Sequence, residues 1–237
     1  MSAVEYRVAS LAGQVWSIDE TFVQSYLIEG RDRAVLFDCC LSGGVSFKNA
    51  VDSLTDKPVQ LVFSHTDGDH TGAQEFFGTP MLNPAEYDYY VSKGNAGKPV
   101  LPLWEGDVLD LGGTLLETVL IPGHTPGHIA LLDRAARRLY VGDTISDRSI
   151  FMFGPGRSLP ALIASLRKLE DLTPAFDTIH TGHGSTSLTS DWVSRTRVVA
   201  EKLAAGELEG VPEPRGLPCR MYSDDGVNLL YTPLTPA

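Results

Sequence analysis

The stretch that decides the fold is Val59-Gln-Leu-Val-Phe-Ser-His65-Thr-Asp-Gly-Asp-His70. Its first half is a short apolar run, which predicts a buried strand over residues 59–64 that ends directly before His65. Four potential metal ligands then follow within six residues. A helix could not point all of them inward, whereas a turn that leaves a strand can, and Gly68 lets the backbone of that turn fold tightly. Imidazole and carboxylate groups are ligands of divalent ions, so this stretch predicts a metal site at a strand end.

The remaining histidines occur in the same setting. All six histidines of the chain fall in three short segments, of which the other two are Gly123-His-Thr-Pro-Gly-His128 and His180-Thr-Gly-His183-Gly. A further carboxylate, Asp143, follows an apolar stretch in Val141-Gly-Asp143-Thr. Each segment comes after a predicted strand, and α/β folds place their chemistry at strand ends. Six histidines that only filled a core would not gather in this way, so we expect these segments to meet at one site.

The elements around these motifs fall into two sets of strands with helices between and after them. Strands are expected at residues 15–18, 23–29, 33–38, 59–64, 114–121, 129–133, 138–141, 177–181 and 227–231, the last of them at a sheet edge. Helices are expected at residues 45–54, 71–77, 84–91, 159–172 and 191–205. This order predicts an α/β (α+β) fold in which helices cover sheets. Because no Pro/Gly/Ser-rich linker divides the sequence, we expect a single domain over residues 1–237.

Composition and charge exclude several classes of function. The formal net charge is −11, and an acidic surface repels phosphate backbones, so we expect no nucleic-acid partner. No apolar run approaches the roughly 20 residues that a membrane span needs, and the first residues do not have the pattern of a secretory leader. The cysteine count of three is odd and two are adjacent, which is not a disulfide framework. We therefore expect a cytoplasmic protein that acts on a small molecule, and the oligomeric state is left open.

In their order and spacing, the motifs resemble those of the metallo-β-lactamase superfamily. The stretch from His65 to His70 resembles the His-x-His-x-Asp-His signature of that family. The segments around residues 123–128, 141–144 and 182–184 resemble its later motifs, and Asp38 resembles an early structural aspartate. The resemblance implies a four-layer αβ/βα sandwich with the metals between the sheet edges.

The same resemblance implies a site with two divalent ions, expected to be zinc. It implies the metal ligands His65, Asp67 and His124 for the first ion, Asp69, His70 and His183 for the second, and Asp143 as a bridge. A metal-bound hydroxide would be the nucleophile, since two cations stabilise hydroxide near neutral pH and polarise the oxygen under attack. Asp69 would also be catalytic, because it orients that hydroxide. The implied activity is hydrolysis of a small ester, thioester, lactone or amide.

Asp67 is where this chain departs from the family, which usually has histidine at that position. A third carboxylate makes the site harder and tilts its preference toward iron or manganese. We expect Asp67 to be a direct ligand; the alternatives are that it binds through water, which leaves the first site weak or empty, or that it orients or caps neighbouring groups. The flavodiiron oxidoreductases resemble this pattern, with a glutamate at the matching position and a diiron centre. A diiron or mononuclear iron oxidoreductase is therefore an alternative function, although the chain has no room for their flavodoxin domain.

Other members of the family define the remaining alternatives. The chain resembles hydroxyacylglutathione hydrolase most, but the basic C-terminal region that binds glutathione in that enzyme is not evident, so glutathione specificity is not expected. A β-lactamase is an alternative, as is a non-catalytic metal-binding domain, which would hold metal tightly without turnover.

Four residues are candidates for substrate contacts. Arg148 and Arg157 follow the Asp143 motif, and a guanidinium there would hold a carboxylate or phosphate. Tyr90 and Trp104 lie between the first two motifs and would form a pocket wall. Solvated surface positions and helix packing explain these four residues equally well. His128 is expected to support its loop, and His180 is expected to end a strand and face the sheet.

Overall fold

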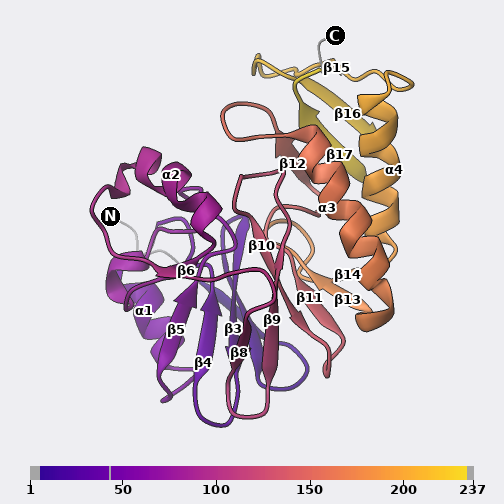
Figure 1. Ribbon diagram of the computed structural model, residues 1–237. Helices are drawn as coiled ribbons and strands as arrows, with labels where there is room; N and C mark the ends of the chain where they lie inside the picture. The colour runs from indigo at the N-terminus through magenta and orange to yellow at the C-terminus, as the bar shows by residue number, and fades with distance from the viewer. Residues whose placement is uncertain (1–5, 43, 234–237) are drawn as a thin grey trace.

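Two large β-sheets lie face to face, and helices cover their outer sides (Figure 1). The computed structural model describes residues 6–42 and 44–233. The first sheet has seven strands in chain order, namely β1 (Arg7–Ser10), β2 (Val15–Glu20), β3 (Val23–Glu29), β4 (Ala34–Phe37), β5 (Val59–Val62), β6 (Met81–Leu82) and β7 (Leu101–Pro102). Its first four strands pair antiparallel, and from β4 to β7 the pairing is parallel.

The second sheet has six strands in the order β14-β13-β11-β10-β9-β8. Its strands are β8 (Val108–Asp110), β9 (Leu115–Leu120), β10 (Ile129–Asp133), β11 (Arg138–Tyr140), β13 (Thr178–His180) and β14 (Leu188–Thr189). β11 and β13 pair in parallel, and the chain between them includes helix α3 (Leu159–Leu172). The parallel pairing brings the ends of β11 and β13, each followed by a ligand motif, to the same edge.

Alternating side chains of the strands build the layers, as the two-residue period of a strand requires. In β4, Val35 and Phe37 point into the core between the two sheets, where the facing residues include Ile129 and Leu131 of β10. The neighbouring residue Leu36 points to the opposite side and packs with helix α1 (Val45–Asp52). The layers are thus helix, sheet, sheet and helix, which confirms the sandwich predicted from the sequence.

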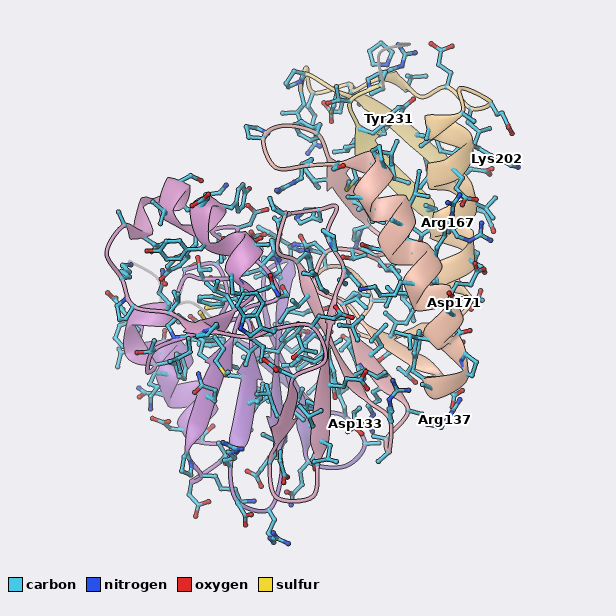
Figure 2. All side chains as sticks on the ribbon, in the orientation of Figure 1. Asp133, Arg137, Arg167, Asp171, Lys202 and Tyr231 are labelled. Atoms are coloured by element: carbon cyan, nitrogen blue, oxygen red, sulfur yellow. The ribbon has the colours of Figure 1, made fainter. Side chains whose placement is uncertain are left out.

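Helices α3 and α4 (Trp192–Ala204) form the outer layer of the second sheet (Figure 1). Ser158 caps α3 by accepting a hydrogen bond from the backbone N–H of Ala161, and Leu162, Leu166 and Leu169 are buried on its inner face. Figure 2 shows the outer side of this pair, where the exposed side chains of Arg167 and Asp171 on α3 and Lys202 on α4 are labelled. Within the described residues, no helix has the length and apolar character that crossing a bilayer requires.

A third, smaller sheet corrects one prediction. Its order is β12-β17-β16-β15, made by β12 (Ser149–Met152), β17 (Val227–Tyr231), β16 (Arg220–Asp224) and β15 (Val211–Pro212). The strand at residues 227–231 was predicted to be an edge strand, which is wrong, because it pairs on one side with β12 and on the other with β16. β16 is largely polar and no residue of it is buried, and β15 has only two residues, both exposed, so neither shows the alternating apolar pattern that marks a strand in a sequence.

The segment between β5 and β7 is less helical than its sequence predicts. At residues 71–77 only one tight turn forms, η1 (Gln74–Phe76). Residues 84–91 form the turn η2 (Pro84–Glu86) and the short helix α2 (Tyr87–Tyr90), and a wider turn, η3 (Val91–Asn95), follows. The part of this segment after residue 84 lies beside the metal-ligand motifs, and its side chains Glu86, Tyr89 and Lys93 contact residues of those motifs.

Candidate metal centre

The side chains that the sequence singles out as metal ligands converge at one edge of the sandwich. They form two clusters, whose ligand atoms lie within 4.8 Å of one another: His65, Asp67 and His124 in one, and Asp69, His70 and His183 in the other. We call them the first and the second half-site. Asp143 lies between them. The four motifs therefore meet, as their positions after predicted strands indicated.

The first half-site has the spacing of a metal centre. Asp67 Oδ2 lies 3.3 Å from His124 Nε2 and 3.6 Å from His65 Nε2. Asp143 Oδ2 is 3.5 Å and 3.9 Å from the same two nitrogens. Ligands at about 2.1 Å from a tetrahedral ion lie about 3.4 Å apart, so these four side chains fit around one divalent ion.

The second half-site has the same spacing. His183 Nε2 lies 3.4 Å from both Asp69 Oδ2 and His70 Nε2. Asp143 approaches this half-site too, with Oδ2 at 3.0 Å from His183 Nε2 and Oδ1 at 3.2 Å from His70 Nε2. Because the carboxylate of Asp143 reaches histidines of both half-sites, it has the position of a bridging ligand.

Unsatisfied polar atoms at the centre support a cation. Among the described residues, His65 Nε2, His124 Nε2 and Asp143 Oδ1 are buried and have no hydrogen-bond partner. Buried polar atoms are normally satisfied, so three of them facing one another call for an ion. Gly182 allows this close approach, since a Cβ there would lie 2.4 Å from Asp143 Oδ1. The residues present therefore fit divalent ions.

At the second half-site, a protonated histidine balances the negative charge of the carboxylates when no metal cation is bound. Burial lowers the pKa of His183, but Asp143 outweighs it and raises that pKa to about 10. The imidazole thus holds a proton where a metal ligand would offer a lone pair. Metal ligands must be deprotonated, so binding of a divalent ion here displaces that proton.

Two of the histidines are oriented by main-chain carbonyl groups. His124 Nδ1 lies 2.9 Å from the carbonyl oxygen of Phe151 in β12, and His183 Nδ1 lies 2.8 Å from that of Phe22 in the β2–β3 turn. A carbonyl can only accept, so each Nδ1 carries the proton and donates it. This fixes the tautomer in which Nε2 is free to bind a metal.

Asp38 and Ser64 orient the other two histidines through buried side chains. Asp38 Oδ2 accepts hydrogen bonds from His70 Nδ1 at 2.9 Å and from the Ser64 hydroxyl at 2.7 Å. The same hydroxyl oxygen lies 2.9 Å from His65 Nδ1 and, having donated its hydrogen to Asp38, accepts the imidazole N–H. Asp38 also accepts from the backbone N–H of Ser64 at 2.7 Å and holds a left-handed φ of 65°. The structural role that the family resemblance implied for Asp38 therefore has a physical basis.

Asp67 has a set of neighbours that the sequence did not indicate. The Tyr89 hydroxyl donates to Asp67 Oδ1 at 2.7 Å, and Lys93 Nζ lies 3.2 Å from the same oxygen. Arg157 Nη2 donates to Asp67 Oδ2, and Arg157 Nη1 donates to the Tyr89 hydroxyl at 2.9 Å. Burial raises the pKa of Asp67, but the adjacent imidazoles and Arg157 outweigh it and hold that pKa well below its usual range. Asp67 is therefore an ionised carboxylate between histidines and cations.

Glu86 connects the loop after β5 with the loop before β10 through hydrogen bonds, and the sequence alone does not indicate this role. It is fully buried, and its Oε1 accepts from both the backbone N–H and the hydroxyl of Thr66 at 3.0 Å. Its Oε2 accepts from the N–H of Gly127 at 2.8 Å, and a Cβ at Gly127 would lie 2.3 Å from the Glu86 nitrogen. A glutamate after Pro84 looks like an ordinary first-turn helix residue, so no local signal marks this contact.

A cavity of about 690 Å³ opens above the half-sites. Its walls include Phe22 and Phe151, and the two arginines that are candidates for substrate contacts, Arg148 and Arg157, also line it. Among the described residues, the exposed guanidinium of Arg148 has no ion-pair or hydrogen-bond partner, whereas that of Arg157 is engaged with Asp67. Arg148 is thus the guanidinium available to a ligand.

Tyr90 and Trp104 do not line this cavity, which corrects their interpretation as pocket walls. Tyr90 is buried in the core beside α1, and its hydroxyl donates to Gln74 Oε1 at 2.8 Å. Trp104 is 57% exposed and is absent from the cavity lining. The neighbouring Tyr89 is the aromatic residue that faces the centre.

His128 and His180 occupy supporting positions. The His128 ring stacks on that of His65, with centroids 4.6 Å apart, and its Nε2 donates to the carbonyl of Val141 at 3.1 Å. His180 stacks on Tyr140 at 4.8 Å, and burial lowers the pKa of His180 to about 4. Both rings pack against other rings, and neither belongs to a group of potential ligands among the residues that the structure describes.

Comparisons with known proteins agree with this architecture. A family model for the metallo-beta-lactamase superfamily matches residues 76–183. The human acyl-coenzyme A thioesterase MBLAC2 is 25% identical over 218 residues, which cover 73% of this chain and 78% of that protein. Hydroxyacylglutathione hydrolase of Mesorhizobium japonicum is 40% identical over 139 residues, which cover 53% of this chain and 48% of that enzyme.

Solved structures share the fold at low sequence identity. The metallo-beta-lactamase from Pontibacter korlensis superposes with a TM-score of 0.72 at 16% identity, covering 83% of this chain and 99% of that one. The metallo-beta-lactamase from Erythrobacter litoralis gives a TM-score of 0.70 at 17% identity, covering 86% and 99%. These likenesses establish the four-layer architecture.

Proposed function

We propose that this chain is a metal-dependent hydrolase of the metallo-β-lactamase superfamily that cleaves a small thioester or ester with a pair of divalent ions, expected to be zinc. Lactones and amides are the other substrates of the same chemistry. The observation that carries the proposal is the convergence of two three-ligand clusters on the shared carboxylate of Asp143. One metallo-β-lactamase-like domain over residues 1–237 is part of the proposal, because the ligands come from both large sheets.

The ligand assignment follows the geometry. His65, Asp67 and His124 would hold one ion, Asp69, His70 and His183 the other, and Asp143 would contact both. Divalent ions bound in this way lower the pKa of a water molecule toward neutrality and polarise the carbonyl oxygen of a substrate. The chain itself contributes orientation, since four hydrogen-bonded Nδ1 atoms turn the imidazoles toward the centre.

Asp69 is the residue we assign to proton handling. It lines the cavity, and its Oδ2 lies 3.4 Å from His183 Nε2. Its carboxylate contacts the histidines of the second half-site, and within the described residues it forms no ion pair with lysine or arginine. A carboxylate in this position would orient the attacking water, accept its proton and pass that proton to the leaving group.

The cavity and the relatives together favour a thioester. The two relatives are named as a thioesterase and as a hydroxyacylglutathione hydrolase. The exposed ring of Phe22 and the side chain of Phe151 offer apolar contact for an acyl chain at the cavity wall. Arg148 offers a cation to an anionic group elsewhere in the substrate.

Metal analysis paired with a substrate panel tests the proposal. Freshly purified protein is expected to contain two zinc ions per chain, to be colourless, and to hydrolyse a thioester or ester faster than a lactone or a β-lactam. Chelation is expected to remove activity and zinc addition to restore it, and Arg134→Gln, far from the cavity on the β10–β11 turn, serves as the control variant. A coloured, iron-loaded protein that consumes oxygen and cleaves no ester would identify an oxidoreductase instead. Tight metal without turnover on any substrate would identify a non-catalytic domain.

A further inference from the structure

Asp67 and Asp69 lie two residues apart, yet within the described residues lysine and arginine side chains contact Asp67 and not Asp69. Asp67 is contacted by two cations, Arg157 at Oδ2 and Lys93 at Oδ1. Asp69 contacts only the imidazoles of His70 and His183, and no lysine or arginine in the described part of the chain reaches it. Each aspartate belongs to one half-site, so the half-sites differ in charge although their ligand types are the same.

The cations around Asp67 are held in place by Tyr89. Lys93 Nζ lies 4.6 Å and the Arg157 guanidinium 5.6 Å from the centroid of the Tyr89 ring, and the Tyr89 hydroxyl accepts from Arg157. Gly156, at a φ of 80°, brings the loop before α3 against this ring, where a Cβ would lie 3.2 Å from a ring carbon. The Arg157 side chain is only 9% exposed. Its contact with Asp67 is therefore built into the packing of two segments and is not a mobile surface pair.

Arg157 contacts the same oxygen that faces the histidines. Asp67 Oδ2 accepts from Arg157 Nη2 and also lies 3.3 Å from His124 Nε2, where an ion would sit. A guanidinium on that oxygen takes up part of its negative charge, and it repels a dication at short range. Asp143 serves both half-sites, so it does not distinguish them. By contrast, no guanidinium in the described part of the chain contacts Asp69, and Asp38 lies behind His70 at 2.9 Å.

We propose that Arg157, with Lys93, is a positioning residue that makes the first half-site bind its divalent ion more weakly than the second, so that the protein fills its two sites in sequence. The inference rests on the proposed two-metal function of the same centre. The second half-site fills first, and the first fills only when its ion shares Asp67 Oδ2 with the guanidinium. The fully loaded state then depends on the free metal concentration.

Titration of the metal-free protein with zinc and with cobalt tests this proposal without measuring activity. Calorimetry is expected to give two unequal phases, with the tighter phase lost in His183→Ala and the weaker phase lost in His124→Ala. Arg157→Met is expected to tighten the weaker phase by about tenfold and to leave the tighter phase unchanged. Arg157→Lys keeps the charge and is expected to restore the weak phase. Arg134→Met makes the same charge change at the β10–β11 turn and serves as the control.

Lys93→Met covers the case in which Arg157→Met fails to fold, because the Lys93 side chain is 38% exposed and its loss disturbs no core. It is expected to tighten the weaker phase in the same direction by a smaller factor. Two equal phases in the wild-type protein, or a weaker first half-site in both variants, would overturn the proposal. Hydrolysis is measured separately on the same samples: unequal phases without turnover contradict the proposed function alone, and turnover with equal phases contradicts this inference alone.

Discussion

The four metal-facing histidines are held in two different ways. His65 and His70 are backed by the buried side chains of Ser64 and Asp38. His124 and His183 are backed by carbonyl oxygens of loops and strands far away in the chain. In the first pair the orienting group is a specific residue type, which mutation can remove. In the second pair it is the course of the backbone, which any residue at that position supplies.

The largest effect is expected from removing an imidazole itself. His70→Ala and His183→Ala, one from each pair, are both expected to abolish metal binding at the second half-site and to reduce hydrolysis to background, because each removes one of the three residues that would hold this ion alone. Metal content by elemental analysis and turnover of the best substrate measure this. His180→Gln, a histidine outside both half-sites, is the control. Full activity at normal metal content in either alanine variant would show that the ligand assignment is wrong.

Removing the carboxylate behind His70 is expected to have the next largest effect. Asp38→Asn keeps the size of the side chain but removes the negative charge that orients His70 Nδ1–H, so zinc affinity is expected to fall by about 10- to 100-fold. Competition with a chromophoric chelator measures the affinity. Asp32→Asn changes an exposed carboxylate that pairs with Arg31 and is the matched control. If packing alone orients His70, the two variants will have the same affinity.

Replacing Asp67 by histidine tests whether an imidazole can bind the ion without a dedicated side chain or carbonyl group that orients its Nδ1. Asp67→His restores the residue type usual in the family, and zinc affinity at the first half-site is expected to rise by about tenfold, because imidazole suits zinc better than a carboxylate held by Arg157 does. Site-resolved zinc titration measures this, with Asp67→Asn as the control that removes the charge without adding an imidazole. Unchanged affinity would argue that residue 67 does not contact the ion.

The smallest effect on metal binding is expected at Phe22. Phe22→Ala keeps the carbonyl that holds His183, so zinc affinity is expected to stay within about twofold. The KM for a substrate with an apolar acyl chain is expected to rise, since the ring is exposed at the cavity wall. Leu115→Ala, another exposed apolar residue on β9, is the control. A large loss of zinc would mean that the ring stacked on His183, rather than the carbonyl, is what holds it.

The same division explains what the sequence predicts well. The ligand residues share a signal, since imidazoles and carboxylates directly follow apolar strands, and strand pairing then brings them together. Asp38 has the same signal, because it directly follows β4. Sheets covered by helices follow from the order of strands and helices, whereas the four-layer sandwich follows from the family resemblance.

What the sequence does not predict depends on distant segments. Arg157 looked like a substrate contact, and only the approach of its loop to α2 turns it onto Asp67. The sequence predicts Tyr90 in a pocket wall, whereas its neighbour Tyr89 is the one that faces the centre, because one step along a helix rotates a side chain by about 100°. Glu86 carries no local mark, since its partners lie in two other loops. In each case the decisive neighbour is separated by many residues and follows no periodic pattern.

The interior position of β17 links the final strand to the metal ligands. Leu230 pairs with Phe151 in the register of β17 and β12, and the carbonyl of Phe151 holds His124. A variant that ends before residue 227 would lack β17, so β12 would lose the strand it pairs with. The carbonyl of Phe151 would then hold the imidazole of His124 less firmly. Affinity tags and trimmed variants at that terminus are therefore best judged by their zinc content as well as by their yield.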